Sequence, residues 1–394
     1  MNPNTFFDAV VIGAGAIGSS VAYHLCQRGM KVALVDSGDI GGGTSSHCDT
    51  YAQLSDKQPG FDTEQGQHSI TYMRELAQKF SYDVELAKRG TLWISESEEE
   101  LAVATNYVSR QQQNGVNMRM VDKQELHEWE PYLREDIPGG HWSPEDTSVN
   151  PYRLCFGFVE EAKKMGLQVF LYEPVTAIKR DADGAVCRVV TSEREFNTKY
   201  VFNCAGVWAP MIGKMVDVDI PIIPRKGVIL ITEATFPIVK QKVQEFGYMA
   251  TKFGDTSYTR YLDPEVERCN VSFIIEQTPD RNLMIGSSRS FSGYDTVSDI
   301  ETIRAIARRA VQMMPVLKEI NCLRTYAGVR PYVDDHLPIL SDVPEVPGFY
   351  IAAGHEGDGI SLSAITGKMM AQYLFGEKTE IDIGKMHLSR FSKT

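Results

Sequence analysis

The chain has 394 residues, of which 43% are hydrophobic and 23% are charged, and its formal net charge at pH 7 is −12. This length allows two domains, and the acidic balance argues against nucleic acid or an anionic membrane as a partner. No apolar run reaches the length of a transmembrane segment, and no basic segment precedes an apolar one at the amino terminus. The sequence therefore predicts a cytoplasmic globular protein.

The cysteines and histidines give no sign of a metal centre. The seven cysteines are scattered, with no C-x-x-C pair, and the eight histidines lack the spacing of metal ligands. We expect neither a metal site nor an iron–sulfur centre in this chain.

The first 36 residues carry a dinucleotide-binding pattern. An apolar run at 6–12 predicts a buried strand, and a helical spacing of apolar residues begins at Ile17. Between them, residues 13–18 read Gly-Ala-Gly-Ala-Ile-Gly, which fits G-x-G-x-x-G. A second strand at 32–35 ends at Asp36. This order predicts a βαβ unit that binds a dinucleotide: a strand, a glycine turn, a helix, a second strand and a terminal acid.

Each part of this unit has a physical task. Gly13 permits a tight turn, Gly15 lets the backbone approach a pyrophosphate, and Gly18 lets the helix pack close to the strand. The helix amino terminus offers N–H groups and a positive dipole end to the phosphates. Asp36 stands where a carboxylate would accept hydrogen bonds from the ribose. The motif by itself fits either FAD or NAD.

A loop rich in glycine and hydroxyl groups follows at 37–48. Three glycines at 41–43 precede Thr44, Ser45 and Ser46, and His47 comes next. Because this loop directly follows the nucleotide unit, we interpret it as a second backbone cradle for the cofactor and not as a plain surface loop.

The middle of the chain mixes helices with strands. We expect one or two helices at 62–88, a strand at 90–94, a helix at 97–113 that begins after Ser97, and an irregular crossing between domains at 131–151. A helix from 151 to about 165, a strand at 168–172, a hairpin at 175–179 and 186–191, and an apolar strand at 200–206 follow. The end of that last strand is expected to approach the cofactor. Segments 220–233 and 271–288 predict an antiparallel sheet, and 298–314 predicts a helix.

A second strand, glycine turn and helix lies near the carboxyl terminus. Residues 349–353 form the strand, 354–359 read Gly-His-Glu-Gly-Asp-Gly, and a helix starts near Ile360. A helix amino terminus at the pyrimidine edge of a flavin would stabilise the negative charge that develops there on reduction. This turn has no evident task in an NAD-dependent dehydrogenase, which is the competing interpretation, and it favours FAD.

Several motifs in the same order resemble the D-amino acid oxidase / glycine oxidase (DAO) family of FAD-dependent oxidoreductases. They are residues 13–18 with Asp36, and residues 43–45, 203–208, 224–227, 285–286, 327–331 and 354–360. Within the family, residues 44–49 and 354–360 look most like the subgroup of the hydrogen cyanide synthase catalytic subunit and the flavin subunits of heteromeric opine, proline and D-hydroxyproline dehydrogenases.

The resemblance implies an α/β fold, α+β overall, in which a Rossmann-like FAD-binding domain is interleaved with an antiparallel-sheet substrate domain. We place the FAD-binding domain at 1–85, 145–216 and 322–394, and the substrate domain at 86–144 and 217–321. The implied reaction is oxidation of the C–N bond of a small amino or imino acid: glycine, proline or hydroxyproline, a D-amino acid or an N-substituted amino acid. Hydride passes to the flavin, and the imine product hydrolyses. The alternative is a flavin subunit of an electron-transferring heteromer that needs its partner subunit.

The resemblance also implies the residue that binds the substrate carboxylate. Arg330 lies in the motif A-G-x-R-P, and a guanidinium can bind a carboxylate through two hydrogen bonds and so hold the substrate against the flavin. The competing interpretation is a structural arginine paired with Asp334 or Asp335. Family members such as glycine oxidase add a tyrosine from the strand before residues 285–286, which this chain lacks. The substrate-binding candidates are therefore Arg330 and, as replacements for that tyrosine, Tyr258, Tyr261 and Tyr332, although a packing role is the favoured interpretation for each of these three.

The cofactor is expected to be non-covalent FAD. The resemblance leaves covalent attachment at His47 as an alternative, and His355 suits either flavin contact or packing. The predicted cofactor-binding residues are Gly13, Gly15, Ala16, Ile17, Gly18, Asp36, Ser37, Gly43, Thr44, Ser45, Ser46, His47, Val175, Ala205, Gly206, Trp208, Arg330, Gly354, His355, Gly357, Asp358, Gly359 and Ile360.

Overall fold

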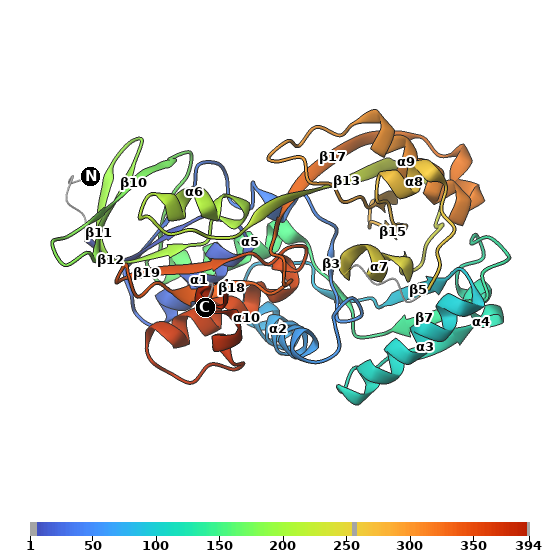
Figure 1. Ribbon diagram of the computed structural model, residues 1–394, viewed down its shortest axis with the longest axis horizontal. Coiled ribbons are helices and arrows are strands. Elements are labelled where there is room, and N and C mark those ends of the chain that lie inside the picture. The colour runs from blue at the N-terminus through green and yellow to red at the C-terminus, as the bar shows by residue number, and fades with distance from the viewer. Residues whose placement is uncertain (1–5, 254–257, 392–394) are drawn as a thin grey trace.

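The protein, seen here in a computed structural model that describes residues 6–253 and 258–391, has two halves built around separate sheets (Figure 1). The first and last parts of the chain share the left half of the view. Strands β13 (Ile223–Ala234) and β17 (Cys322–Tyr332) extend from there toward the right half. The mixed α/β fold expected from the sequence is confirmed.

The first sheet has eight strands, with five parallel strands at its centre. Its main path is β10-β11-β12-β1-β2-β9, and β19 pairs with β12 and with β18. The pairs that β1 forms with β12 and β2, and that β12 forms with β19, are parallel. The strands are β1 (Phe6–Ile12), β2 (Val32–Val35), β9 (Gln168–Phe170), β10 (Val175–Arg180), β11 (Val186–Thr191), β12 (Glu195–Asn203), β18 (Ile339–Asp342) and β19 (Phe349–Ala353).

Strand β1 is apolar along most of its length because both faces of this sheet are covered. Ala9 and Val11 pack into the core under the helices, whereas Val10 and Ile12 pack into the core on the opposite face. A strand buried on both sides has no polar face, and this explains the continuous apolar run in the sequence.

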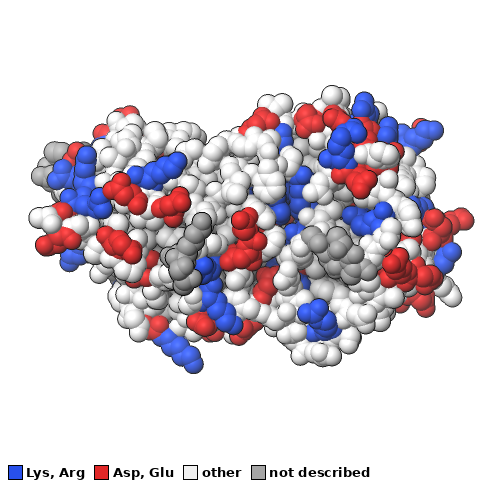
Figure 2. Space-filling model, viewed as in Figure 1, with Lys and Arg blue, Asp and Glu red and all other residues white. Residues whose placement is uncertain are grey.

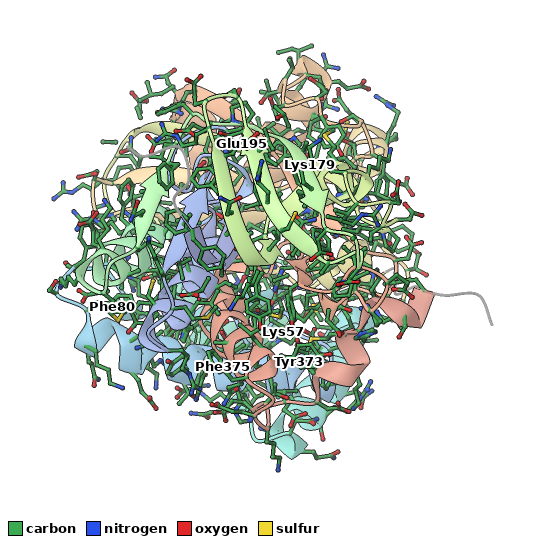
Figure 3. The ribbon with its side chains drawn as sticks, turned by 90° about the vertical axis from the view of Figure 1, so that its left-hand side faces the viewer. Lys57, Phe80, Lys179, Glu195, Tyr373 and Phe375 are labelled. Carbon is green, nitrogen blue, oxygen red and sulfur yellow. The ribbon has the colours of Figure 1, made fainter. Side chains whose placement is uncertain are left out.

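Four helices cover one face of the first sheet. Helix α1 (Ala16–Gln27) packs against α5 (Pro151–Lys164) and α10 (Gly359–Leu374), and α10 packs against α2 (Phe61–Lys79). In Figure 3, Lys179 and Glu195 mark strands on one side, while Tyr373 and Phe375 mark the end of α10 on the other.

The helix expected at 62–88 is shorter than predicted. It ends at Lys79, because Phe80 already has an extended backbone conformation. The next residues bond to α5 and to the loop before it: Ser81 N donates to Glu161 and Asn150 N donates to the carbonyl of Val84. These long-range bonds replace the helical ones.

The second sheet also has eight strands, in the order β17-β13-β16-β15-β14-β5-β7-β6. All neighbouring pairs are antiparallel except β14 with β5. The antiparallel sheet predicted from residues 220–233 and 271–288 is thus present. Its remaining strands are β5 (Thr91–Ser95), β6 (Arg119–Asp122), β7 (Gly139–Ser143), β14 (Lys242–Glu245), β15 (Ile274–Gln277) and β16 (Asn282–Gly286).

Strand β7 corrects the prediction of an irregular crossing at 131–151. A Cβ atom on Gly140 would lie 1.9 Å from the carbonyl oxygen of Trp93 on β5, so only glycine allows the two strands to pair at this point. Glycine is uncommon inside strands, and the segment therefore reads as a loop in the sequence.

Shorter helices complete the second half and the junction. Helix α3 (Glu98–Gln113) confirms the helix predicted at 97–113, and Ser97 caps it by accepting a hydrogen bond from Glu100 N (3.1 Å). The others are α4 (Lys123–Trp129), α6 (Ala209–Lys214), α7 (Gly247–Phe253), α8 (Pro264–Arg268) and α9 (Ile300–Met313).

The chain crosses between the halves several times. A small sheet of β3 (Tyr51–Ala52), β8 (Thr147–Ser148) and β4 (Ala87–Lys88) joins segments near these crossings. Strand β17, which the predicted boundary at 322 assigned to the FAD-binding domain, pairs with β13 in the second sheet from Cys322 to Tyr332. The domain boundaries stay a prediction.

On the face shown in Figure 2, acidic and basic side chains are interspersed. Within residues 6–253 and 258–391, no helix is both long and apolar enough to cross a membrane. The same residues contain no group of three or more His, Cys, Asp or Glu side chains that could hold a metal ion.

Candidate active site

A cavity of about 510 Å³ is lined by residues of both halves. From the first half come the glycine turn after β1, the loop after β2, the end of β12 and the turn before α10. From the second half come residues of β13, β15 and β17 and the start of α7. Of the predicted cofactor-binding residues, all line this cavity except Gly18, Ser46 and Asp358. Their roles stay a prediction.

The glycine turn at 13–18 is closed by backbone contacts that exclude side chains. Gly13 has φ +106°, and a Cβ on it would lie 2.5 Å from the carbonyl oxygen of Cys204. A Cβ on Gly18 would lie 1.8 Å from the carbonyl oxygen of Gly13. Gly15 differs, because its φ of −73° suits any residue and only Ser45 Oγ lies near its Cβ position. The missing side chain of Gly15 therefore keeps space open at the start of α1.

The side chain of Asp36 fixes the conformation of this turn through two hydrogen bonds. Its Oδ2 accepts a hydrogen bond from Ala14 N (2.6 Å) and its Oδ1 accepts one from Gly38 N (2.7 Å). The carboxylate lies at the cavity wall with its orientation fixed by both bonds. This position agrees with the predicted contact to a ribose and adds a structural task that the motif does not reveal.

The loop at 43–49 lies between the glycine turn and β17. Ser45 Oγ accepts from Ala16 N (3.0 Å), and Thr44 Oγ1 donates to the carbonyl of Val329 (2.7 Å). His47 Nδ1 donates to the carbonyl of Gly43 (2.8 Å). A Cβ on Gly328 would lie 2.5 Å from His47 Cβ, so the loop packs directly on β17. This loop therefore links the phosphate-binding turn to the strand that carries Arg330.

The turn at 354–358 leads into α10, as predicted. His355 lines the cavity, and its Nε2 shares a hydrogen bond with Thr366 Oγ1 (3.0 Å). Burial lowers the pKa of His355 to about 3, so the ring is neutral at physiological pH. The side chain of Asp358 instead pairs with Lys57 and Lys252 outside the cavity lining.

Arg330 on β17 lies in the cavity wall and has no carboxylate partner among the described residues. Its Nη1 donates to the carbonyl of Ser288 (3.2 Å), and its guanidinium occupies the space that a Cβ on Gly227 would need. Asp335 pairs with Arg390 instead, and no ion pair joins Asp334 to Arg330 in the described part of the chain. Burial, followed by the charge of Arg289, lowers the pKa of Arg330 from its ordinary value.

None of the three candidate tyrosines lines the cavity. Tyr261 is 87% exposed, Tyr258 is buried beside Phe246, and the ring of Tyr332 lies 4.5 Å from Arg225 Cζ. The tyrosine that does line the cavity is Tyr248, at the start of α7. It was not among the predicted site residues. Tyr248 follows β14, in which three of the four residues are polar, so the sequence gives little apolar signal there.

Asp49 is a second cavity residue that was not among the predicted site residues. It lines the cavity, and its Oδ2 lies 2.7 Å from Lys242 Nζ on β14. Burial disfavours the charged form of Lys242, but the carboxylates of Asp49 and Glu276 outweigh burial and raise its pKa. The cavity therefore has an acidic group on Asp49 as well as the cationic group on Arg330.

Glu276 lies next to Asp49 and controls part of the pH dependence of stability. Its carboxylate accepts hydrogen bonds from Thr50 N (3.1 Å) and Thr50 Oγ1 (2.9 Å). Burial, followed by the charge of Asp49, raises the pKa of Glu276 to about 6 from 4.5. When folding raises the pKa of a carboxyl group, that group stabilises the folded state at pH values below its pKa in the unfolded chain. This stabilisation is lost as the pH rises through its pKa in the folded protein.

As the pH rises from about 4.5 to 7, Glu276 ionises and the wild type is expected to lose about 2 kcal/mol of folding free energy. Glu276→Gln is expected to be free of this loss. Glutamine cannot ionise, so it does not carry that penalty. Urea unfolding of both proteins at the two ends of this range measures the difference. Glu99→Gln, on the exposed side of α3, is the matched control. Equal pH dependence in wild type and Glu276→Gln would contradict the prediction.

Comparisons with known proteins agree with this arrangement. The family described as DAO, FAD dependent oxidoreductase, matches residues 8–373. Glycine oxidase of Bacillus subtilis (strain 168) is 26% identical over 385 residues, 95% of each chain. Hydrogen cyanide synthase subunit HcnC of Pseudomonas aeruginosa is 26% identical over 434 residues, 98% of this chain and 97% of that protein. The crystal structure of L-proline dehydrogenase from P. horikoshii has the same fold, with a TM-score of 0.86 and 23% identity over 99% of this chain and 98% of that chain.

Proposed function

The chain belongs to the DAO family of FAD-dependent oxidoreductases that act on amino acids, and we propose that it oxidises the C–N bond of a small amino or imino acid whose carboxylate binds Arg330. The observation that supports this proposal is the position of Arg330: a partly buried guanidinium in the cavity wall, without a carboxylate partner among the described residues. A partly buried cation that faces a cavity is stabilised by an anion, and the substrate carboxylate supplies one.

The residues of the cavity fit FAD. Gly15 leaves space at the amino terminus of α1, where a pyrophosphate would accept N–H hydrogen bonds. Asp36 would bind the ribose, and the start of α10 would lie at the pyrimidine edge of the flavin. When bound, FAD supplies the acceptor for a hydride from the substrate. The competing assignment to an NAD-dependent dehydrogenase is wrong, since the family is FAD-dependent.

The chain's own residues position the substrate and hold its protons. Arg330 orients the α-carbon through the carboxylate. Asp49, on the same cavity and of opposite charge, would accept a hydrogen bond from the amine and receive the proton that the amine must lose before oxidation. The ion pair with Lys242 Nζ (2.7 Å) holds the Asp49 carboxylate in place.

A second candidate function is that of a flavin subunit in an electron-transferring heteromer. It is favoured by the similarity to HcnC, whose name describes a subunit. In that case the isolated chain would bind FAD and amino acid but would pass electrons to a partner subunit and react slowly with oxygen.

The visible spectrum of the purified flavoprotein under anaerobic conditions tests these proposals. Glycine, sarcosine, L- and D-proline, the hydroxyprolines, several D-amino acids, aspartate and iminodiacetate are added one at a time. Bleaching of the flavin band by one of them is expected, and failure of every amino acid to bleach it would contradict the proposal. Rapid recovery of the band in air indicates an oxidase, and slow recovery indicates the heteromeric function. Acid precipitation of the same sample shows whether the flavin remains attached, as covalent linkage at His47 requires.

A further inference from the structure

Three arginines lie near one another in the second half beside the cavity, and one of them, Arg330, lines it. Arg225 on β13 lies directly opposite Arg330 on β17, and Arg289 follows β16. Arg225 and Arg289 are each 5% exposed. Like charges in directly opposite positions of an antiparallel pair are unfavourable, so this arrangement requires anionic partners. Consistent with this closeness of like charges, burial and the charges of Arg289 and Arg330 lower the pKa of Arg225.

The protein itself supplies a carboxylate for one of these three arginines. Glu356, in the turn before α10, pairs with Arg225. Within residues 6–253 and 258–391, neither Arg330 nor Arg289 forms an ion pair. Arg330 donates to the carbonyl of Ser288, and Arg289 Nη1 donates to Thr251 Oγ1 (2.9 Å). Two positive charges therefore remain without an anionic partner among the described residues: Arg330 in the cavity wall and Arg289 next to Tyr248.

Arg289 lies against the Tyr248 ring and does not itself line the cavity. Its Cζ lies 4.2 Å from the centre of the Tyr248 ring, and that ring lines the cavity. Its Nε is buried and has no hydrogen-bond partner among the described residues. A buried donor on a charged group is costly when left unpaired, and an anion next to Tyr248 would satisfy it.

The cofactor does not account for both charges. The predicted pyrophosphate site is the turn between β1 and α1 in the first sheet, whereas the arginines belong to strands of the second sheet or to the segment after one. A single substrate carboxylate at Arg330 would leave Arg289 without an anion.

From this geometry we infer that the substrate carries two carboxylates: one that binds Arg330 next to the C–N bond, and a second that binds Arg289 at the edge of Tyr248. The substrate class is an amino dicarboxylate, in which the second carboxylate is on the side chain or on a substituent of the nitrogen. This inference rests on the proposed function and narrows it, and Arg289 is the residue that determines specificity.

Two matched ligand pairs test the inference on the FAD-loaded protein under anaerobic conditions. Iminodiacetate is compared with N-ethylglycine, and aspartate with 2-aminobutyrate in both enantiomers, because the members of each pair differ only by a carboxylate in place of a methyl group. Ligand dissociation constants come from the change in the flavin spectrum. In at least one pair the dicarboxylate is expected to bind about tenfold or more tightly than its partner. The pair that shows this preference identifies the position of the second carboxylate.

Arg289→Gln is expected to abolish that preference by weakening the dicarboxylate about tenfold or more while changing the monocarboxylate less than about threefold. Arg289→Lys, which keeps the charge, is expected to retain part of it. Thr251→Val, which removes a hydrogen bond of Arg289 but no charge, is the matched control and should keep the preference. Equal weakening of both ligands in Arg289→Gln would show that Arg289 only supports Tyr248 and would overturn the inference.

The unmodified protein gives an independent answer if a variant fails to fold. Monocarboxylates that bind as tightly as their dicarboxylate partners in both pairs would overturn the inference and leave the proposed function intact. A flavin that responds to no amino acid of either kind would instead count against the proposed function.

Discussion

Replacement of Arg330 by leucine is expected to lower kcat/KM for the amino acid substrate by about 10³-fold. The change removes the cation that binds the carboxylate, and it also removes the constraint that holds the α-carbon against the flavin. Anaerobic flavin reduction at varied substrate concentration separates the two contributions, as a weaker apparent affinity and a slower limiting rate.

Two controls show that such a loss arises from the site. Arg324→Leu changes an exposed arginine of the same strand and should leave kcat/KM unchanged. Arg330→Leu should still retain FAD, because the predicted pyrophosphate and ribose sites lie in the first sheet and the Arg330 side chain donates only to a backbone carbonyl among the described residues. A kcat/KM within about threefold of the wild type would exclude Arg330 as the carboxylate-binding residue.

Gly15→Ala is expected to weaken FAD binding about 10–100-fold while leaving the protein folded. The backbone of Gly15 suits alanine, and the new methyl group would meet only Ser45 Oγ, at 3.1 Å. It would, however, occupy space at the start of α1 where the pyrophosphate must approach the backbone N–H groups. The ratio of flavin to protein absorbance after gel filtration, together with the dissociation constant of added FAD, measures the effect.

Gly29→Ala is the matched control for Gly15→Ala. Gly29 has φ +76° and open space around its Cβ position, so alanine there strains the backbone far from the cavity. We expect a loss of about 1 kcal/mol of stability and normal FAD binding. Normal FAD affinity in Gly15→Ala would contradict the placement of the pyrophosphate at this turn.

The elements that could be predicted from the sequence have signals within a short segment. The βαβ unit is one example, because its glycines, apolar strand and terminal acid lie within about 30 residues and each has a local physical cause. Helix α3 is another, since the Ser97 cap and the acidic first turn fix its beginning. Arg330 became a candidate through the motif around it.

The elements that were missed depend on contacts between distant residues. Strand β14 carries Lys242, Gln244 and Glu245, which are buried only because Asp49, Gln53 and Arg309 pair with them. Such a segment has the composition of a surface loop, and Tyr248 directly after it was therefore overlooked. Strand β7 was missed because its glycines are required by the neighbouring strand.

The interleaved topology also constrains how the protein is made. Strand β12 receives β1 on one side and β19 on the other, so its nucleotide-binding sheet joins residue 6 to residue 353. The second sheet likewise lacks its β17 edge until residue 332 has been synthesised. During translation, the first sheet therefore lacks β19 until residue 353 has been synthesised, and both sheets expose unpaired strand edges before their last strands arrive. Such exposed edges are where aggregation of an incomplete chain can begin.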